Sequence, residues 1–159
     1  MEVIRHRIIE RCCGARFEAL SKYYFVDVGL RNARLNYRQQ EENHIMENII
    51  FNELRIRGYR VHVGIVEVHE KNKDGKTALK KLEVDFIATK GNQKYYIQSA
   101  FEMPSQDKKN QELRPLLKIN DSFKKIIVVK DDIKIKRDEN GITTMGIYDF
   151  LLKGNSLDL

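Results

Sequence analysis

The chain of 159 residues lacks the segments that mark membrane and exported proteins. No apolar stretch approaches the roughly 20 residues that a membrane-spanning helix needs. The first residues, MEVIRHRIIERCC, contain no uncharged hydrophobic run typical of a signal peptide. Cysteine is scarce, since Cys12 and Cys13 are the two present, and they are neighbours. Neighbouring cysteines rarely bridge each other, so we expect free thiols and predict a cytoplasmic protein with no membrane partner.

Proline and glycine are also few, with two and nine residues, and 42% of the residues are hydrophobic. This composition favours a globular protein over a disordered one. The length is enough for one domain with a substantial core. A structural zinc site needs about four ligands, and no histidine cluster adds to the two cysteines, so we do not expect such a site.

The net charge of +6 is distributed unevenly. Residues 1–40 hold eight Lys and Arg against four acids, and residues 103–137 hold ten against five. Residues 41–102 are balanced, with ten of each sign. Two basic ends around a neutral centre fit contact with nucleic acid or an acidic partner. The same pattern also fits a solvated, lysine-rich surface without a partner.

Hydrophobic periodicity predicts a helix and then three strands. Between Glu41 and Arg57 the apolar residues recur at three- and four-residue steps, and Gly58 stands where a helix C-cap belongs. Alternating and β-branched residues then predict strands over 59–70, 79–89 and 94–101, with turns at Asp74-Gly75 and Gly91-Asn92.

A second helix and a buried strand follow. Pro104 and Ser105 open a polar helical stretch that runs to about Lys118, in which Pro115 implies a kink or an early stop. The apolar segment 124–130 is bounded by lysines and fits a buried central strand.

The ends of this pattern are shorter elements. Residues 22–37 fit a strand or turn and then a short helix, and residues 146–154 fit a strand end or a short helix after an Asn140-Gly141 turn. The order predicts an α/β fold, a mixed central sheet flanked by helices with an αβββαβ core. We expect one domain over residues 22–159, preceded by a segment, 1–21, that is a remnant of a linker or helical region.

Two of the predicted strands each present one polar side chain. KLEVDFIA (81–88) presents Asp85, and KYYIQSAF (94–101) presents Gln98. The arrangement resembles the PD-(D/E)XK, or restriction-endonuclease-like, nucleases, in which two adjacent strands carry Asp and then Glu-x-Lys. Here Gln98-Ser99-Ala100 replaces Glu-x-Lys. The resemblance therefore implies the nuclease scaffold, but the replaced residues argue against nuclease activity.

Several longer phrases resemble the C-terminal domain, of unknown function, found in bacterial and archaeal AAA+ ATPases. They are KYYFVDVGLRNA (22–33), HIMENIIFNELRIRGYRVHVG (44–64), LEVDFIA (82–88), YYIQSAF (95–101) and ELRPLLKI (112–119). The resemblance implies a nuclease-like fold and an ATPase module as partner. This chain has no G-x-x-x-x-G-K-[ST] loop to hold ATP phosphates, so we expect that module to be missing from it.

The resemblance suggests a shared polar cluster of Glu47, Asp85 and Gln98. Two carboxylates are suitable ligands for Mg²⁺, so Asp85 and Glu47 are the candidate metal ligands. A neutral Gln98 weakens such a site, and Ala100 cannot replace the missing lysine, for which Lys94 and Lys118 are candidate substitutes. The alternative is structural, with Asp85 satisfying buried backbone or an arginine such as Arg114. Gln98 would then be a hydrogen-bonding amide in the sheet, and Glu47 a residue on the polar face of its helix.

Basic residues supply a weaker prediction of nucleic-acid binding. Arg114 could bind a phosphate or clamp Asp85, or it could cap the second helix. The other candidates for contact with DNA phosphates are Lys80, Lys81, Lys108, Lys109 and Lys118. Lysines on edge strands also discourage aggregation, which is the alternative role for the strand lysines.

These observations leave three functional hypotheses. The first is a non-catalytic, nuclease-like recognition or interaction domain of a AAA+ ATPase, with DNA as its candidate ligand. The second is an active Mg²⁺-dependent nuclease acting on DNA ends or branches. The third is a protein–protein docking domain with no nucleic-acid role.

Overall fold

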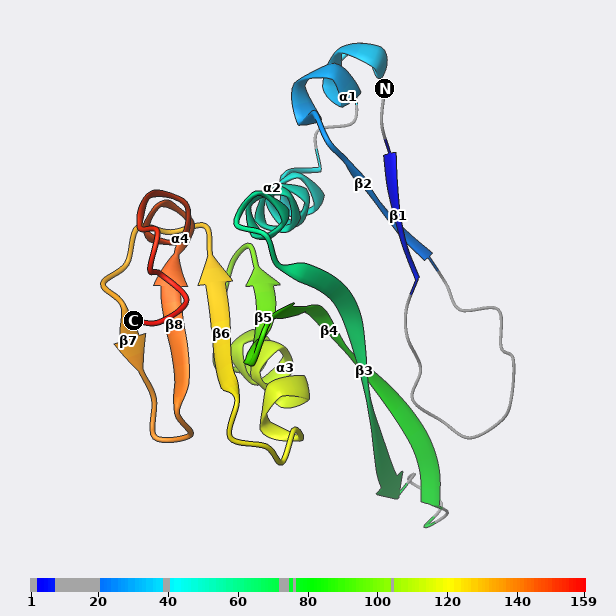
Figure 1. The fold of residues 1–159 in the computed structure, drawn as a ribbon. Helices are drawn as coiled ribbons and strands as arrows, with labels where there is room; N and C mark the ends of the chain where they lie inside the picture. Colours follow the sequence, from blue (N-terminus) through cyan, green and yellow to red (C-terminus); the bar gives the residue numbers. More distant parts are fainter. Residues whose placement is uncertain (1–2, 8–20, 39–40, 72–74, 76, 104) are drawn as a thin grey trace.

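The computed structural model describes residues 3–7, 21–38, 41–71, 75, 77–103 and 105–159 (Figure 1). Its helices are α1 (Val28–Arg34), α2 (Glu42–Ile56), α3 (Gln106–Leu117) and α4 (Ile147–Leu152). Its strands are β1 (Val3–Arg7), β2 (Ser21–Phe25), β3 (Arg60–Lys71), β4 (Thr77–Lys90), β5 (Gln93–Ala100), β6 (Lys124–Val129), β7 (Lys136–Arg137) and β8 (Ile142–Gly146). Cys12, Cys13 and Asp74 lie outside the described residues.

The main sheet has six strands in the order β3-β4-β5-β6-β8-β7. The first three form an antiparallel meander, whereas β5, β6 and β8 run parallel. Parallel pairing of β5 with β6 requires a crossover, and α3 supplies it. The predicted α/β class, with a mixed sheet flanked by helices, is therefore confirmed.

Helices cover both faces of this sheet. One core joins α2 and α4 to the sheet through side chains such as Ile50, Phe51, Phe86 and Phe150, none of which is accessible to solvent. A second core lies on the other face, where Leu113 and Leu116 of α3 pack in a cluster with residues of β4, β5 and β6. Because the central strands are covered on both sides, β6 reads as a continuous apolar run rather than an alternating one.

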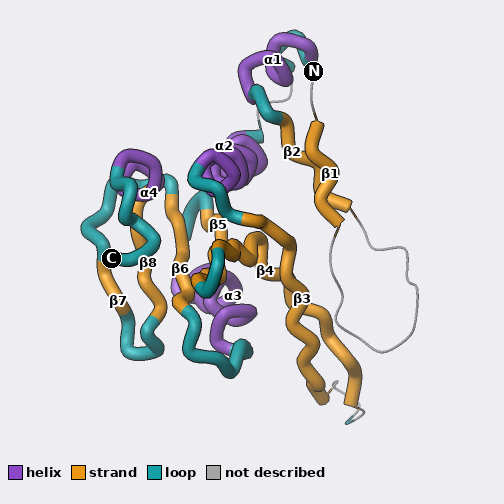
Figure 2. The backbone as a smooth tube through the Cα atoms, viewed as in Figure 1, coloured by secondary structure: helices purple, strands orange, loops and turns teal. Residues whose placement is uncertain are grey.

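A two-stranded antiparallel ribbon, β1–β2, lies apart from the six-stranded sheet (Figure 2). It is held against α2 chiefly by Tyr24, whose ring stacks on Phe51 at a centroid distance of 4.2 Å. Asn48 adds a pair of hydrogen bonds of 2.8 Å, accepting from the backbone N–H of Phe25 and donating to its carbonyl. This docking brings residues of β2 to the main sheet.

The predicted order of helix, three strands, helix and strand is found with boundaries within about two residues. Gly58 ends α2 with a φ of +82°, and Gly91 turns β4 into β5 with a φ of +57°, conformations that favour glycine. Pro115 lies in the last turn of α3, which runs on to Leu117. The sequence analysis did not predict β8 as a separate strand, although all five of its residues are buried.

Among the described helices, none has the length and apolar character needed to cross a membrane.

Candidate functional site

The site forms where the pairing of the central strands is irregular. In the β3–β4 register His62 faces Ile87 and Gly64 faces Val84, so Asp85 and Phe86 of β4 share one position opposite β3. Such a β-bulge bends the strand and re-aims a side chain. The bulge explains how Val84 packs in the core beside α3 while Phe86 packs in the core beside α2.

Asp85 and Gln98 replace backbone pairing between β4 and β5. The β4–β5 register runs from the Lys90–Gln93 pair to the Phe86–Ile97 pair and ends before Asp85. Beyond it, Oδ2 of Asp85 accepts a hydrogen bond of 2.9 Å from the backbone N–H of Ser99. Oε1 of Gln98 accepts from the backbone N–H of Asp85 at 3.4 Å. Two buried side chains thus satisfy backbone donors that the sheet leaves unpaired.

A lysine from β2 joins the predicted carboxylates. Nζ of Lys22 lies 2.9 Å from Oε1 of Glu47, on α2, and 3.3 Å from Oδ1 of Asp85. Glu83 forms a third ion pair with the same ammonium group. The hydroxyl of Tyr24 donates to Oε1 of Glu47 at 2.7 Å. We call Lys22, Tyr24, Glu47, Glu83 and Asp85 the Lys22 cluster.

The side chain of Gln98 does not join this cluster. Its Nε2 donates to Oε2 of Glu112, on α3, at 3.2 Å. The side-chain amide of Gln98 therefore connects β4 with α3. It contacts the backbone of Asp85 and not the carboxylates of Asp85 and Glu47. The structure thus brings Glu47 and Asp85 together at one ammonium group, whereas Gln98 meets Asp85 only through the backbone N–H of that residue and extends its amide nitrogen to α3.

The charges of the cluster are unequal, with three carboxylates around one ammonium group. Burial raises the pKa of Asp85 to about 7, because the opposing effect of Lys22 is incomplete and Glu47 adds to the rise. Burial lowers the pKa of Lys22, but the charges of Asp85 and Glu47 outweigh it and leave that pKa above its ordinary value. Burial and then Glu47 likewise raise the pKa of Tyr24. Lys22 therefore stays charged, and Asp85 changes its charge near neutral pH.

The residues present do not fit the Mg²⁺ ion that the nuclease resemblance implies. The ammonium group of Lys22 lies in the space between Glu47 and Asp85 that a bridging ion would need. Gln98 offers its amide oxygen to a backbone donor instead. Throughout the described ranges, no three His, Cys, Asp or Glu side chains are arranged to hold a metal ion.

The other predicted residues lie elsewhere. Ala100 is buried, with 2% of its surface exposed. Lys94 lies 3.7 Å from Asp121 and 4.6 Å from the ring centre of Tyr96, and Lys118 is the C-cap residue of α3. Neither is among the residues that pair with Asp85 or Glu47.

The predicted nucleic-acid residues are divided between two elements. Arg114 pairs with Glu70 and so ties α3 to β3, whereas the cation that contacts Asp85 is Lys22. Lys80 and Lys81 are exposed on β4, and the backbone N–H groups of Lys108 and Lys109 bond to Ser105 at the start of α3.

The sequence analysis missed Lys22, Tyr24 and Glu83. A period-two signal could have found them, because Lys22 and Tyr24 are two residues apart on one strand, as are Glu83 and Asp85 on another. The distance along the chain hid the pairing, since β2 and β4 are separated by two helices and a strand.

A hollow of about 320 Å³ lies beside the cluster, between β2, α1 and α2. Its lining combines aromatic, acidic and basic side chains: Lys22, Tyr23, Tyr24, Phe25, Arg31, Glu41, His44, Glu47 and Asn48. Glu47 is therefore reached from this side, and the hollow carries charges of both signs.

Comparison with known proteins finds a relative in Haemophilus influenzae (strain ATCC 51907 / DSM 11121 / KW20 / Rd), described as an uncharacterized protein. The two are 34% identical over 133 residues, which are 84% of this chain and 29% of the relative. The chain thus spans less than a third of the length of that protein. No family model matches the chain. No solved structure matches it significantly.

Proposed function

We propose that this domain is a nuclease-like, non-catalytic recognition and interaction module of a AAA+ ATPase, with DNA as its ligand. The observation that carries the non-catalytic assignment is the position of Lys22. Its ammonium group pairs with both candidate metal ligands, Glu47 and Asp85. A positive charge fixed between two carboxylates competes directly with a divalent ion for the same oxygens.

Two further observations support the module. The order α2-β3-β4-β5-α3-β6 is that of the restriction-endonuclease-like core, and Asp85 lies on the second of its strands. The Haemophilus influenzae relative extends well beyond the matched region, which suits a domain that works as part of a longer protein. Neither observation depends on catalysis.

A second candidate is an active nuclease in which Lys22 takes the role of the lysine missing at Ala100. Nζ of Lys22 lies 3.3 Å from Oδ1 of Asp85, which favours Lys22 over Lys94 or Lys118 as the source of the positive charge. It requires Lys22 to leave the carboxylates so that a metal ion can bind them.

A cleavage assay separates the two candidates. The protein is incubated with supercoiled plasmid and with branched DNA in Mg²⁺ or Mn²⁺, alongside the variants Asp85→Ala and Lys22→Met, with Lys80→Met as the matched control. We expect all substrates to stay intact. Metal-dependent cutting that is lost in both cluster variants and kept in Lys80→Met would replace the first candidate with the second.

A further inference from the structure

The Lys22 cluster is a poor surface for a polyanion, because carboxylates outnumber the ammonium group that they share. Phosphates approaching these side chains would meet a net negative charge. If the domain binds nucleic acid, the basic residues that account for its charge of +6 must provide a different surface.

Such a surface lies at the end of the sheet where β3, β5 and β6 begin and β4 ends. Arg60 pairs with Thr89 across β3 and β4, and Lys90 pairs with Gln93 across β4 and β5. The next pair, Tyr95 with Lys124, belongs to β5 and β6. Arg60, Lys90, Lys94 and Lys124 therefore stand on four successive strands at one end of the sheet, and we call them the basic row. Because side chains alternate along a strand, Arg60 and Lys94 lie on the face that α3 covers, and Lys90 and Lys124 lie on the face that α2 covers.

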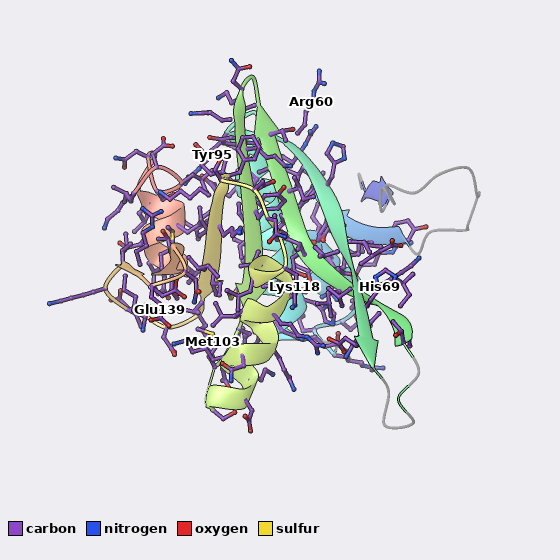
Figure 3. The ribbon with its side chains drawn as sticks, turned by 90° about the horizontal axis from the view of Figure 1, so that it is seen from below. Arg60, His69, Tyr95, Met103, Lys118 and Glu139 are labelled. Atoms are coloured by element: carbon purple, nitrogen blue, oxygen red, sulfur yellow. The ribbon has the colours of Figure 1, made fainter. Side chains whose placement is uncertain are left out.

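The row is separate from the Lys22 cluster. Lys90 follows Asp85 by five residues on the same strand, which corresponds to roughly 16 Å at about 3.3 Å per residue. Figure 3 shows Arg60 and Tyr95 toward one end of the sheet and Met103, which follows β5, toward the other. A ligand on the basic row would not need to contact the carboxylates.

Three cations at this end have no acidic partner within the part of the chain that the structure describes. Arg60 is exposed, and its carbonyl oxygen accepts a hydrogen bond from the hydroxyl of Thr89. Arg55 is exposed at the end of α2, and its guanidinium donates only a weak hydrogen bond of 3.4 Å to the carbonyl of Tyr59. Nζ of Lys90 donates to the carbonyl of Arg57 and lies 5.5 Å from the ring centre of Tyr59.

The remaining members lie near acids. Lys94 lies 3.7 Å from Asp121, and Lys124, which donates to the backbone carbonyl oxygen of Leu159, experiences the charge of Asp158. The turn between β4 and β5 is exposed and carries no acid, since it consists of Gly91 and Asn92. The surface is therefore positive, and the exposed side chains of Ile56 and Phe123 stand next to Arg55 and Lys124 in the chain.

We propose that the end of the sheet formed by Arg55 and the basic row binds the phosphate backbone of duplex DNA without reading its sequence. Strands about 4.8 Å apart spread the four backbone positions over roughly 15 Å, so a DNA strand that crosses this end of the sheet would pass cations from both faces. This inference rests on the proposed recognition function and adds the surface that performs it.

The test measures how the affinity for a fluorescent 20-base-pair duplex changes with salt. The domain is compared with Arg55→Ala/Arg60→Ala and with Lys80→Ala/Lys81→Ala, a matched pair of exposed cations on the β3–β4 hairpin. Loss of two phosphate contacts should flatten the slope of log K against log salt by about 1.8, at about 0.9 per contact. The hairpin variant should keep the slope of the unaltered protein.

The outcomes separate this inference from the proposed function. If the hairpin variant flattens the slope and the arginine variant does not, the surface is wrong and DNA recognition stands. If the unaltered domain does not bind DNA even at low salt, both fail. If the domain binds anionic vesicles through Arg55 and Arg60 but does not bind DNA, the inference is likewise overturned. Circular dichroism of each variant confirms that it is folded.

Discussion

Replacing Lys22 with methionine tests the electrostatic account of the cluster. The side chain keeps its length and loses its charge, which leaves Glu47, Glu83 and Asp85 without their shared cation. Breaking a buried ion pair by removing one partner costs about 3–5 kcal/mol. Because the side chain of Lys22 is 26% exposed, we expect the lower end of that range, about 3 kcal/mol, at pH 8.

The loss should depend on pH in a definite direction. The pKa of Asp85 is about 7 in the folded protein, above its ordinary value of 3.8, so its effect on stability becomes less favourable as pH rises from about 4 to 7. Without Lys22 that pKa rises further, and the decline continues above pH 7. Each unit corresponds to about 1.4 kcal/mol, so the cost of the substitution should be roughly half as large at pH 5 as at pH 8.

Urea unfolding at both pH values measures this difference. Lys80→Met is the control, and because Lys80 is exposed we expect its effect to stay within about 0.5 kcal/mol. Adding Asp85→Asn to the Lys22→Met variant should remove most of the pH dependence, since the titrating group is gone. A Lys22→Met variant that loses no stability, or loses the same amount at pH 5 and pH 8, would refute the reasoning.

Two further predictions concern the docking of β2 on α2 and the packing at the start of α4. Asn48→Ala should cost about 1–2 kcal/mol, because it leaves the N–H of Phe25 without its partner on α2, whereas the carbonyl of Phe25 keeps the hydrogen bond from Asn52. Urea unfolding against the exposed control Asn43→Ala measures the loss. Gly146→Ala should lower the melting temperature markedly, because a Cβ there would lie 2.6 Å from the backbone oxygen of Asp131. Gly154→Ala, where a Cβ meets no atom within 4 Å, should have little effect, and equal melting temperatures for the two variants would count against this explanation.

The sequence was sufficient to predict the helices and strands that form the core. The helix ending at Gly58, the strands on either side of Gly91 and the apolar strand β6 follow from periodicity and from glycine's access to positive φ. It also singled out Asp85 and Glu47, whose proximity the structure confirms through Lys22. The periodicity and glycine signals are local, because each depends on residues within one element or one turn, whereas the grouping of Asp85 with Glu47 came from the family resemblance.

The tertiary structure alone decided which groups surround Asp85. The bulge in β4, the docking of β2 through Tyr24 and Asn48, and the turn of Gln98 toward Glu112 all depend on contacts between distant segments. Hydrophobic periodicity reports which face of a strand is buried, but not which charged side chain of another element will fill the space above it. The identity of the cation between Glu47 and Asp85 is therefore a property of the folded chain, and it determines whether those carboxylates are available to a metal ion.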